Sequence, residues 1–214
     1  MFTVFEFYSY LMCLMLPVVI GLRGLGRFNK SLRIIWLWMT VTLASELAAG
    51  VAGLLTGNNL WVYHVYTPVS FWMIAVYYNY RLPVFRRYRL GYLVGMIGIV
   101  VELIDTFHFH AYDQMDSYAI VVTSMLGLVM VLLEIGRGLL KERGAMLRDP
   151  YCQISLLFGF FWAFSTLMLG SEMVFSPLQA VALASLQFLW TVNIAVHLGF
   201  GYIFSRVTDL KTGV

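Results

Sequence analysis

The chain has 214 residues, of which 61% are hydrophobic and only 12% are charged, and its formal net charge is +3. A soluble globular domain carries roughly 25% charged residues and about 45–50% apolar ones, so the composition excludes that class and indicates an integral membrane protein. The positive charge does not predict a nucleic-acid partner, because the basic residues form no soluble patch interleaved with exposed aromatic side chains.

Seven apolar runs are long enough to cross a bilayer core, which needs about 20 helical residues. They predict an all-α fold, in which residues 1–214 form a single seven-transmembrane-helix bundle. The expected helices are approximately 2–22, 34–56, 60–81, 90–110, 117–140, 151–173 and 179–205. The first run contains Glu6 and no basic residue precedes it, so we interpret it as a retained helix and not as a cleavable signal peptide.

The basic residues indicate the orientation of the chain. All 14 lysines and arginines belong to the first, third and fifth connections, their immediate flanks, and the C-terminal tail. Under the positive-inside rule, this one-sided placement puts the N-terminus outside and the C-terminus in the cytoplasm. We therefore expect a multi-pass protein of the cell inner (plasma) membrane, with the lipid bilayer around it and a basic face toward the cytoplasm.

Ionisable side chains interrupt three of the predicted spans. Glu46 lies about 18 Å from the cytoplasmic start of the helix over 34–56, and Glu102 is equally far along the helix over 90–110. His64 lies about one turn below the outer end of the helix over 60–81. Such side chains cost several kcal/mol when they face lipid, so we expect them to face the bundle interior or a water-filled cavity.

The stretch ELIDTFHFH, at the end of the fourth predicted helix, divides into two sets. Glu102 and Asp105 are three residues apart and share a helix face, which we expect to turn toward Glu46 and His64. His108 points elsewhere, and both it and His110 are close enough to the outer surface to meet water. The acids therefore indicate a site, and the histidines do not.

Two further patterns lie in the fifth and seventh predicted helices. Gln187, Trp190, Asn193 and His197 fall within about a third of the helix circumference and form a polar stripe. Glu134 is near the cytoplasmic end of its helix, three residues before Arg137, so we expect a local ion pair there.

Together these residues predict a polar pocket that opens outward and binds a small molecule. Its expected ligand-binding residues are Glu46, His64, Glu102, Asp105, Gln187, Trp190 and Asn193. The alternative is that the same groups only hold helices together through hydrogen bonds. We assign no catalytic residue, metal or cofactor: no HExxH motif and no pair of histidines one turn apart occurs. A retinal Schiff base is excluded, because the last predicted helix contains no lysine.

Three segments resemble a group of short, uncharacterised seven-helix proteins of Bacteroidota. They are NNLWVYHVYTPVSFWMIAVYYNYRL, DPYCQISLLFGFFWAFSTLMLGSEM and LQFLWTVNIAVHLGFGYIF. Members of that group are often encoded beside sensor histidine kinases, so the resemblance implies a sensory or signalling role. This chain differs from the group's pattern in Ser70, where a carboxylate is expected, and in Cys152 and Gln153, where aromatic residues are expected.

The leading hypothesis is a non-enzymatic membrane protein with a sensory role. It would bind a small ligand from the outer side and contact a cytoplasmic or membrane signalling protein through its basic face. One alternative is an intramembrane enzyme, with or without a metal, that uses Glu46, His64, Glu102 and Asp105. Another is a small-solute transporter, although the first and last three helices show no convincing internal repeat.

Overall fold

The structure is a computed structural model that describes residues 4–109, 117–141, 148–175 and 179–209. Side chains are described for a smaller set, which omits 4–6, 117, 141, 168–175, 179–187 and 189. Every element in the described part is helical, which confirms the all-α class. The elements are α1 (Val4–Gly24), η1 (Leu25–Arg27), α2 (Lys30–Thr56), α3 (Leu60–Arg81), α4 (Pro83–Tyr88), α5 (Leu90–Ile104), η2 (Asp105–Phe109), α6 (Ser117–Lys141), α7 (Pro150–Phe175) and α8 (Gln179–Asp209).

Four helical segments in these ranges are long and apolar enough to cross a bilayer. They are Phe7–Arg27, Lys30–Thr56, Leu90–Phe109 and Tyr118–Leu140. Their outward faces carry large apolar side chains such as Met12, Leu54 and Leu132, as expected of a surface that meets lipid. The chain is therefore a helical transmembrane protein. The total of seven spans and the orientation of the termini stay predictions.

Local sequence signals set several helix ends. The Asn29 side chain accepts a hydrogen bond from the backbone N–H of Leu32 at 3.1 Å and so caps the start of α2. Gly57 ends α2 with φ 73°, a conformation that glycine adopts without steric cost. Pro83 occupies the first turn of α4, where its missing N–H has no partner to lose.

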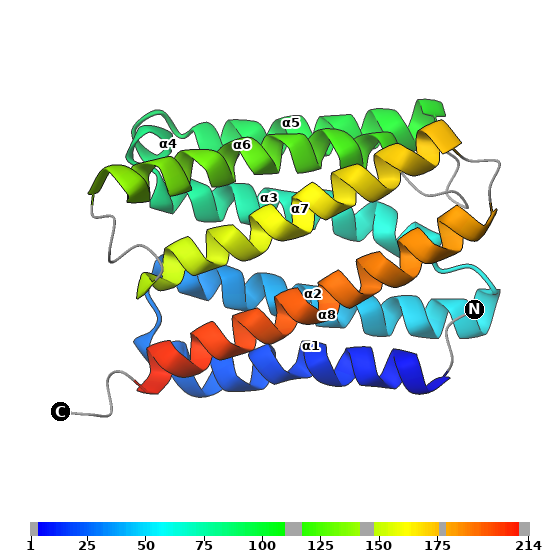
Figure 1. Cartoon of the computed structure of the whole chain (residues 1–214), viewed down its shortest axis with the longest axis horizontal. Helices are drawn as coiled ribbons and strands as arrows, with labels where there is room; N and C mark the ends of the chain where they lie inside the picture. Colours follow the sequence, from blue (N-terminus) through cyan, green and yellow to red (C-terminus); the bar gives the residue numbers. More distant parts are fainter. Residues whose placement is uncertain (1–3, 110–116, 142–147, 176–178, 210–214) are drawn as a thin grey trace.

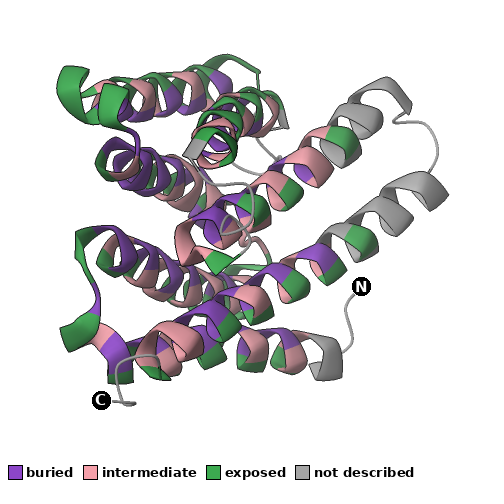
Figure 2. Cartoon of the chain, turned by 60° about the vertical axis from the view of Figure 1, so that its left-hand side comes forward, coloured by how far each residue is buried: buried purple, intermediate pink, exposed green. Residues whose placement is uncertain are grey.

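The long helices form a closed ring. Each packs on the next one along the chain, and α1 also packs on α8 (Figure 1). Helix α3 contacts α2, α5 and α6, so it lies deeper in the bundle than its neighbours. Figure 2 shows the buried faces of the helices turned toward one another and the exposed faces turned outward. The interior of the ring is therefore the place where polar side chains can avoid lipid.

Glycines bring α5 close to α3. Gly91, Gly95 and Gly98 recur at intervals of four and three residues and are all buried. A Cβ atom at Gly95 would stand 2.6 Å from Cδ1 of Trp72, and one at Gly91 would overlap the backbone of α3. This spacing of small residues allows close packing between helices in a membrane. Helix α5 is thus fixed against the side of α3 that faces away from α2.

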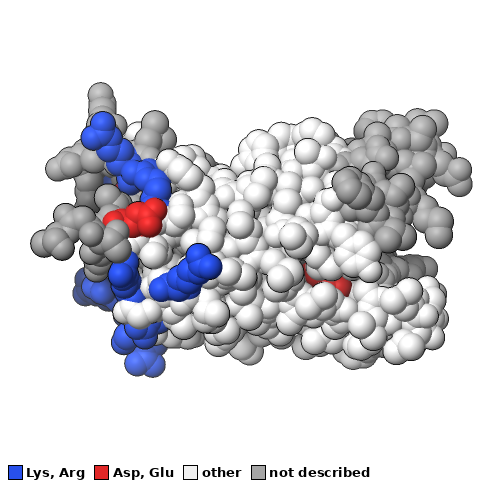
Figure 3. All heavy atoms as spheres, turned by 90° about the horizontal axis from the view of Figure 1, so that it is seen from below, with Lys and Arg blue, Asp and Glu red and all other residues white. Residues whose placement is uncertain are grey.

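Basic residues gather at one end of the bundle, as the visible face in Figure 3 shows. Just inside that end, Glu134 is 3% exposed and accepts hydrogen bonds from Arg137 at 2.6 Å and from Arg81 at 2.8 Å. The expected pairing of Glu134 with Arg137 is confirmed. The Arg81 guanidinium also lies 3.7 Å from the centre of the Tyr151 ring, a cation–π contact. These contacts join α3, α6 and α7, and we call them the Glu134 cluster.

Candidate functional site

A cavity of about 210 Å³ lies inside the ring. Six helices line it, namely α1, α2, α3, α6, α7 and α8. Its lining residues are Tyr10, Trp38, Thr42, Glu46, Tyr63, Tyr66, Thr67, Ser70, Phe71, Ile74, Ile120, Thr123, Ser124, Phe158, Phe161, Trp162, Ser165, Asn193, Val196 and His197. Water fills about 30 Å³ per molecule, so a cavity this size holds about seven waters or one small organic molecule.

Helical periodicity explains why each helix contributes several lining residues. On α3 the lining positions run from Tyr63 to Ile74 at steps of three and four, which is one face of an α-helix. On α2, Trp38, Thr42 and Glu46 follow one another at steps of four, which is also one helix face. Trp38 and Glu46 are about 12 and 24 Å along α2 from Lys30 at 1.5 Å per residue. Helix α2 has 27 residues and is about 40 Å long. The cavity therefore begins about a third of the way along α2 and extends away from the basic end.

Glu46 holds a fixed place in the cavity wall. Its Oε1 accepts a hydrogen bond from the Tyr10 hydroxyl at 3.2 Å, and its Oε2 accepts one from the Tyr63 hydroxyl at 3.0 Å. The two tyrosines belong to α1 and α3, on either side of α2. Hydrogen bonds from both sides reduce the cost of placing this carboxyl group inside the bundle.

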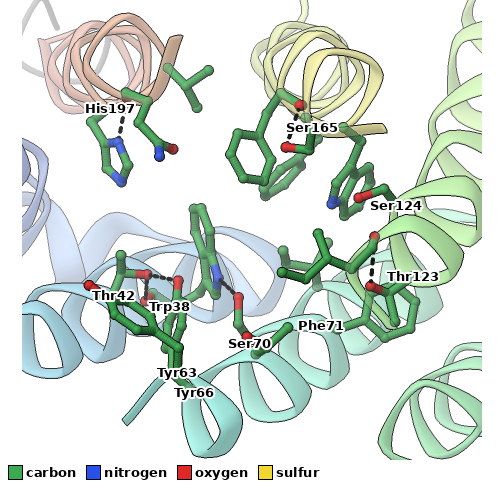
Figure 4. Close-up of a pocket in the computed structure, with 18 of the residues that line it drawn as sticks. Trp38, Thr42, Tyr63, Tyr66, Ser70, Phe71, Thr123, Ser124, Ser165 and His197 are labelled. Carbon is green, nitrogen blue, oxygen red and sulfur yellow. Dashed lines mark hydrogen bonds between the residues drawn. The ribbon is translucent and has the colours of Figure 1, made fainter. Parts of the chain in front are cut away.

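A second hydrogen-bonded set lies next to the first. The indole N–H of Trp38 donates to the Ser70 hydroxyl at 2.7 Å. The hydroxyl oxygens of Thr42 and Tyr66 are also 2.7 Å apart. Figure 4 shows these residues on the side of α2 and α3, and His197 entering the cavity from the opposite side. The polar groups therefore face one another across the cavity.

His197 is the buried histidine of the site, with 3% of its surface exposed. Its Nδ1 lies 2.5 Å from the backbone oxygen of Asn193, which can only accept, so Nδ1 carries the hydrogen. In the neutral ring Nε2 is then an acceptor, and it makes no hydrogen bond to any described residue. The ring stands edge-on to Tyr10 and parallel to Trp38, with centroid distances of 6.1 and 6.4 Å.

Of the residues predicted for the site, Glu46 and Asn193 line the cavity. Trp190 does not line the cavity but packs against Tyr10, which does, with ring centroids 5.9 Å apart. The side chain of Gln187 lies outside the described residues.

The other three predicted residues lie between α3, α5 and α6, where they do not line the cavity. His64 Nδ1 is 3.0 Å from the Thr106 hydroxyl, and Asp105 accepts from the backbone N–H of Ala119 at 2.8 Å. Glu102 is buried with 1% of its surface exposed. The structure therefore does not bring the α5 acids to Glu46, because α3 stands between them. His108 is exposed, and His110 lies outside the described residues.

Most of the cavity's polar groups are absent from the predicted set. They are neutral residues that attract little notice in an apolar helix, namely Trp38, Thr42, Tyr63, Tyr66, Ser70, Thr123, Ser124 and Ser165. A signal was present in the sequence, because hydroxyl and aromatic residues recur at helical spacing on α2, α3, α6 and α7. No group of three histidine, cysteine or acidic side chains suited to a metal ion occurs among the residues that the structure describes.

Comparison with known proteins yields one local similarity. The chain is 31% identical over 86 residues to a phospho-N-acetylmuramoyl-pentapeptide-transferase of Leuconostoc mesenteroides. The alignment covers 38% of this chain and 26% of that enzyme, so the chain spans about a quarter of the relative's length. No protein-family model matches the chain. No solved structure matches it significantly.

Proposed function

We propose that this protein is a seven-span sensor of the inner membrane. In this proposal the N-terminus lies outside, a small molecule enters from the outer side and binds in the cavity, and the basic cytoplasmic face contacts a signalling partner. The observation that carries the proposal is the cavity itself, which combines aromatic walls with a carboxyl group and a histidine. Such a mixture of apolar surface and a few placed polar groups is typical of small-molecule sites.

The connections between the cavity and the Glu134 cluster support a sensory role. Helix α3 carries Tyr66 in the cavity wall and Arg81 in the cluster, and α6 likewise carries Thr123 and Glu134. A ligand that favours one arrangement of these helices would therefore shift the cluster as well. The resemblance to proteins encoded beside sensor histidine kinases agrees with this role.

Binding can be tested with indole, which is small, aromatic and uncharged. Equilibrium dialysis of labelled indole against the full chain in phosphatidylcholine nanodiscs, with empty nanodiscs as the blank, should reveal a saturable site. Ser165→Phe should abolish it, because the new ring fills the cavity. Ser205→Phe is the matched control: Ser205 is also a helical serine bonded to its own helix backbone, but it does not line the cavity.

Coupling between the cavity and the Glu134 cluster can be tested by measuring ligand affinity in a variant of the cluster. If the cavity and the Glu134 cluster are coupled, Glu134→Gln should change the affinity for indole by about fivefold or more. An unchanged affinity in a folded Glu134→Gln protein would mean that binding is not transmitted, and would contradict a sensor.

A further inference from the structure

Three hydroxyl groups of the cavity act as acceptors toward it. Thr42, Thr123 and Ser165 each donate their hydrogen to the carbonyl oxygen four residues earlier in their own helix, at 2.7 to 2.9 Å. Because the Thr42 hydrogen is used in this way, Tyr66 is the donor in its contact with Thr42. These hydroxyl oxygens can therefore offer a ligand lone pairs but no hydrogen.

Three other donors in the wall are also used within the protein. Tyr10 and Tyr63 both donate to Glu46, and the Trp38 N–H donates to Ser70. His197 presents Nε2, a buried acceptor that bonds no described residue. The ligand that complements such a wall carries N–H or O–H groups.

The charge of Glu46 restricts the class of ligand further. Both oxygens of Glu46 accept hydrogen bonds, which is the arrangement that an ionised carboxylate adopts. No arginine, lysine or histidine within the described ranges forms an ion pair with it. Glu46 is half-buried. A carboxylate that is partly removed from water and has no cation beside it is costly, and a positively charged ligand would offset that cost.

The aromatic rings of the cavity wall also favour a positively charged ligand. Tyr10, Trp38 and Tyr63 surround the carboxyl and histidine groups, and the faces of aromatic rings attract ammonium ions. Tyr10 links the two polar groups, since its hydroxyl binds Glu46 and its ring contacts His197. Both acceptors therefore lie next to the same side chain of the wall. The volume of about 210 Å³ is below the roughly 300–1,000 Å³ of typical ligand sites, so one ring system with a short chain is the fitting size.

We infer that the cavity binds a small aromatic ammonium ion, whose N–H groups donate to the Glu46 carboxylate and to Nε2 of His197. The inference rests on the proposed function, because it names the class of ligand for that cavity.

Tryptamine and indole form the matched pair of probes, since they share a ring and differ in the aminoethyl chain, which is protonated at pH 7. Dialysis against the full chain in phosphatidylcholine nanodiscs should show tryptamine bound at least about thirtyfold more tightly than indole, because its ammonium pairs with a carboxylate that is partly removed from water. N-acetyltryptamine, which has the chain but no charge, should bind no better than indole. This comparison needs no substitution.

Variants then locate the contact. Glu46→Gln keeps an acceptor for the tyrosines and removes the charge, so tryptamine binding should weaken about thirtyfold while indole binding stays the same. His197→Phe should weaken tryptamine binding about tenfold. Glu102→Gln is the matched control, a buried carboxyl on α5 outside the cavity, and should leave both probes unaffected.

The outcomes separate the two proposals. If indole binds and Ser165→Phe abolishes this, yet tryptamine binds no better or Glu46→Gln has no effect, the ammonium class is wrong and the cavity remains a ligand site. If neither probe binds, or Ser165→Phe affects neither, the proposed function fails and this inference fails with it.

Discussion

Replacing Glu134 by glutamine tests how much the Glu134 cluster holds the bundle together. The substitution keeps the size and one acceptor of the side chain but removes the charge that faces two guanidinium groups at 2.6 and 2.8 Å. Removing one member of a buried ion pair costs about 3–5 kcal/mol, because the remaining charge is left buried. Of these two contacts, the one with Arg81 joins α6 to α3.

Two features of the structure make the expected cost of Glu134→Gln smaller than about 3–5 kcal/mol. The Arg81 and Arg137 side chains are 16% and 26% exposed, so water recovers part of the lost interaction. A carboxylate oxygen of Asp149 also lies 3.9 Å from Arg81 and offers a second partner. We therefore expect Glu134→Gln to lower the free energy of unfolding by about 2–3 kcal/mol.

Reversible unfolding in mixed micelles, driven by sodium dodecyl sulfate and followed by circular dichroism, measures this change. Arg137→Gln leaves Glu134 paired with Arg81 and should cost about 1 kcal/mol. The double variant should be less destabilised than the sum of the two single changes, because both remove the same contact. A loss below about 0.5 kcal/mol for Glu134→Gln would refute the cluster as an interhelical tie, and strict additivity would mean that the Glu134–Arg137 pair within α6 contributes nothing.

Three other predictions follow from the packing and the orientation. Gly91→Ala should destabilise the bundle by about 1–3 kcal/mol in the same unfolding assay, since its methyl group would overlap the backbone of α3, whereas Gly136→Ala, with no neighbour within 4 Å, should be neutral. Asp105→Ala should cost about 1 kcal/mol, because the carboxylate accepts from a backbone N–H in the first turn of α6. In a chain without native cysteines, an impermeant thiol reagent outside the cell should label a cysteine at Asn58 and not at Tyr88; the reverse result would overturn the orientation and the outer entrance.

The all-helical membrane class could be predicted because it depends on composition. An apolar run of about 20 residues leaves its backbone only one way to satisfy its hydrogen bonds in lipid. The placement of Glu46 and Asn193 inside the bundle follows from the same energetics. These properties require no knowledge of which helices are neighbours.

The cavity depends on neighbours, which is why the sequence indicated it only in part. Helical phase puts Glu102 and Asp105 on one face, but it does not say which helix covers that face. The glycines of α5 pack on α3, and the acids lie at that side of the bundle instead of at Glu46. The backbone also becomes π-helical over Asp105–Phe109, which changes the angular step assumed for an α-helix.

The closed ring has a consequence for how the protein is made. Ribosomes deliver the N-terminal helices first, so α1, α2 and α3 meet while the later helices are still being synthesised. These three already contain Tyr10, Glu46 and Tyr63, and the carboxyl group can therefore find its two hydroxyl donors early, before lipid has to accommodate it alone. His197 arrives with α8, which has to enter between α1 and α7. A nascent chain thus carries the acid of the site, already hydrogen-bonded, well before the histidine completes it.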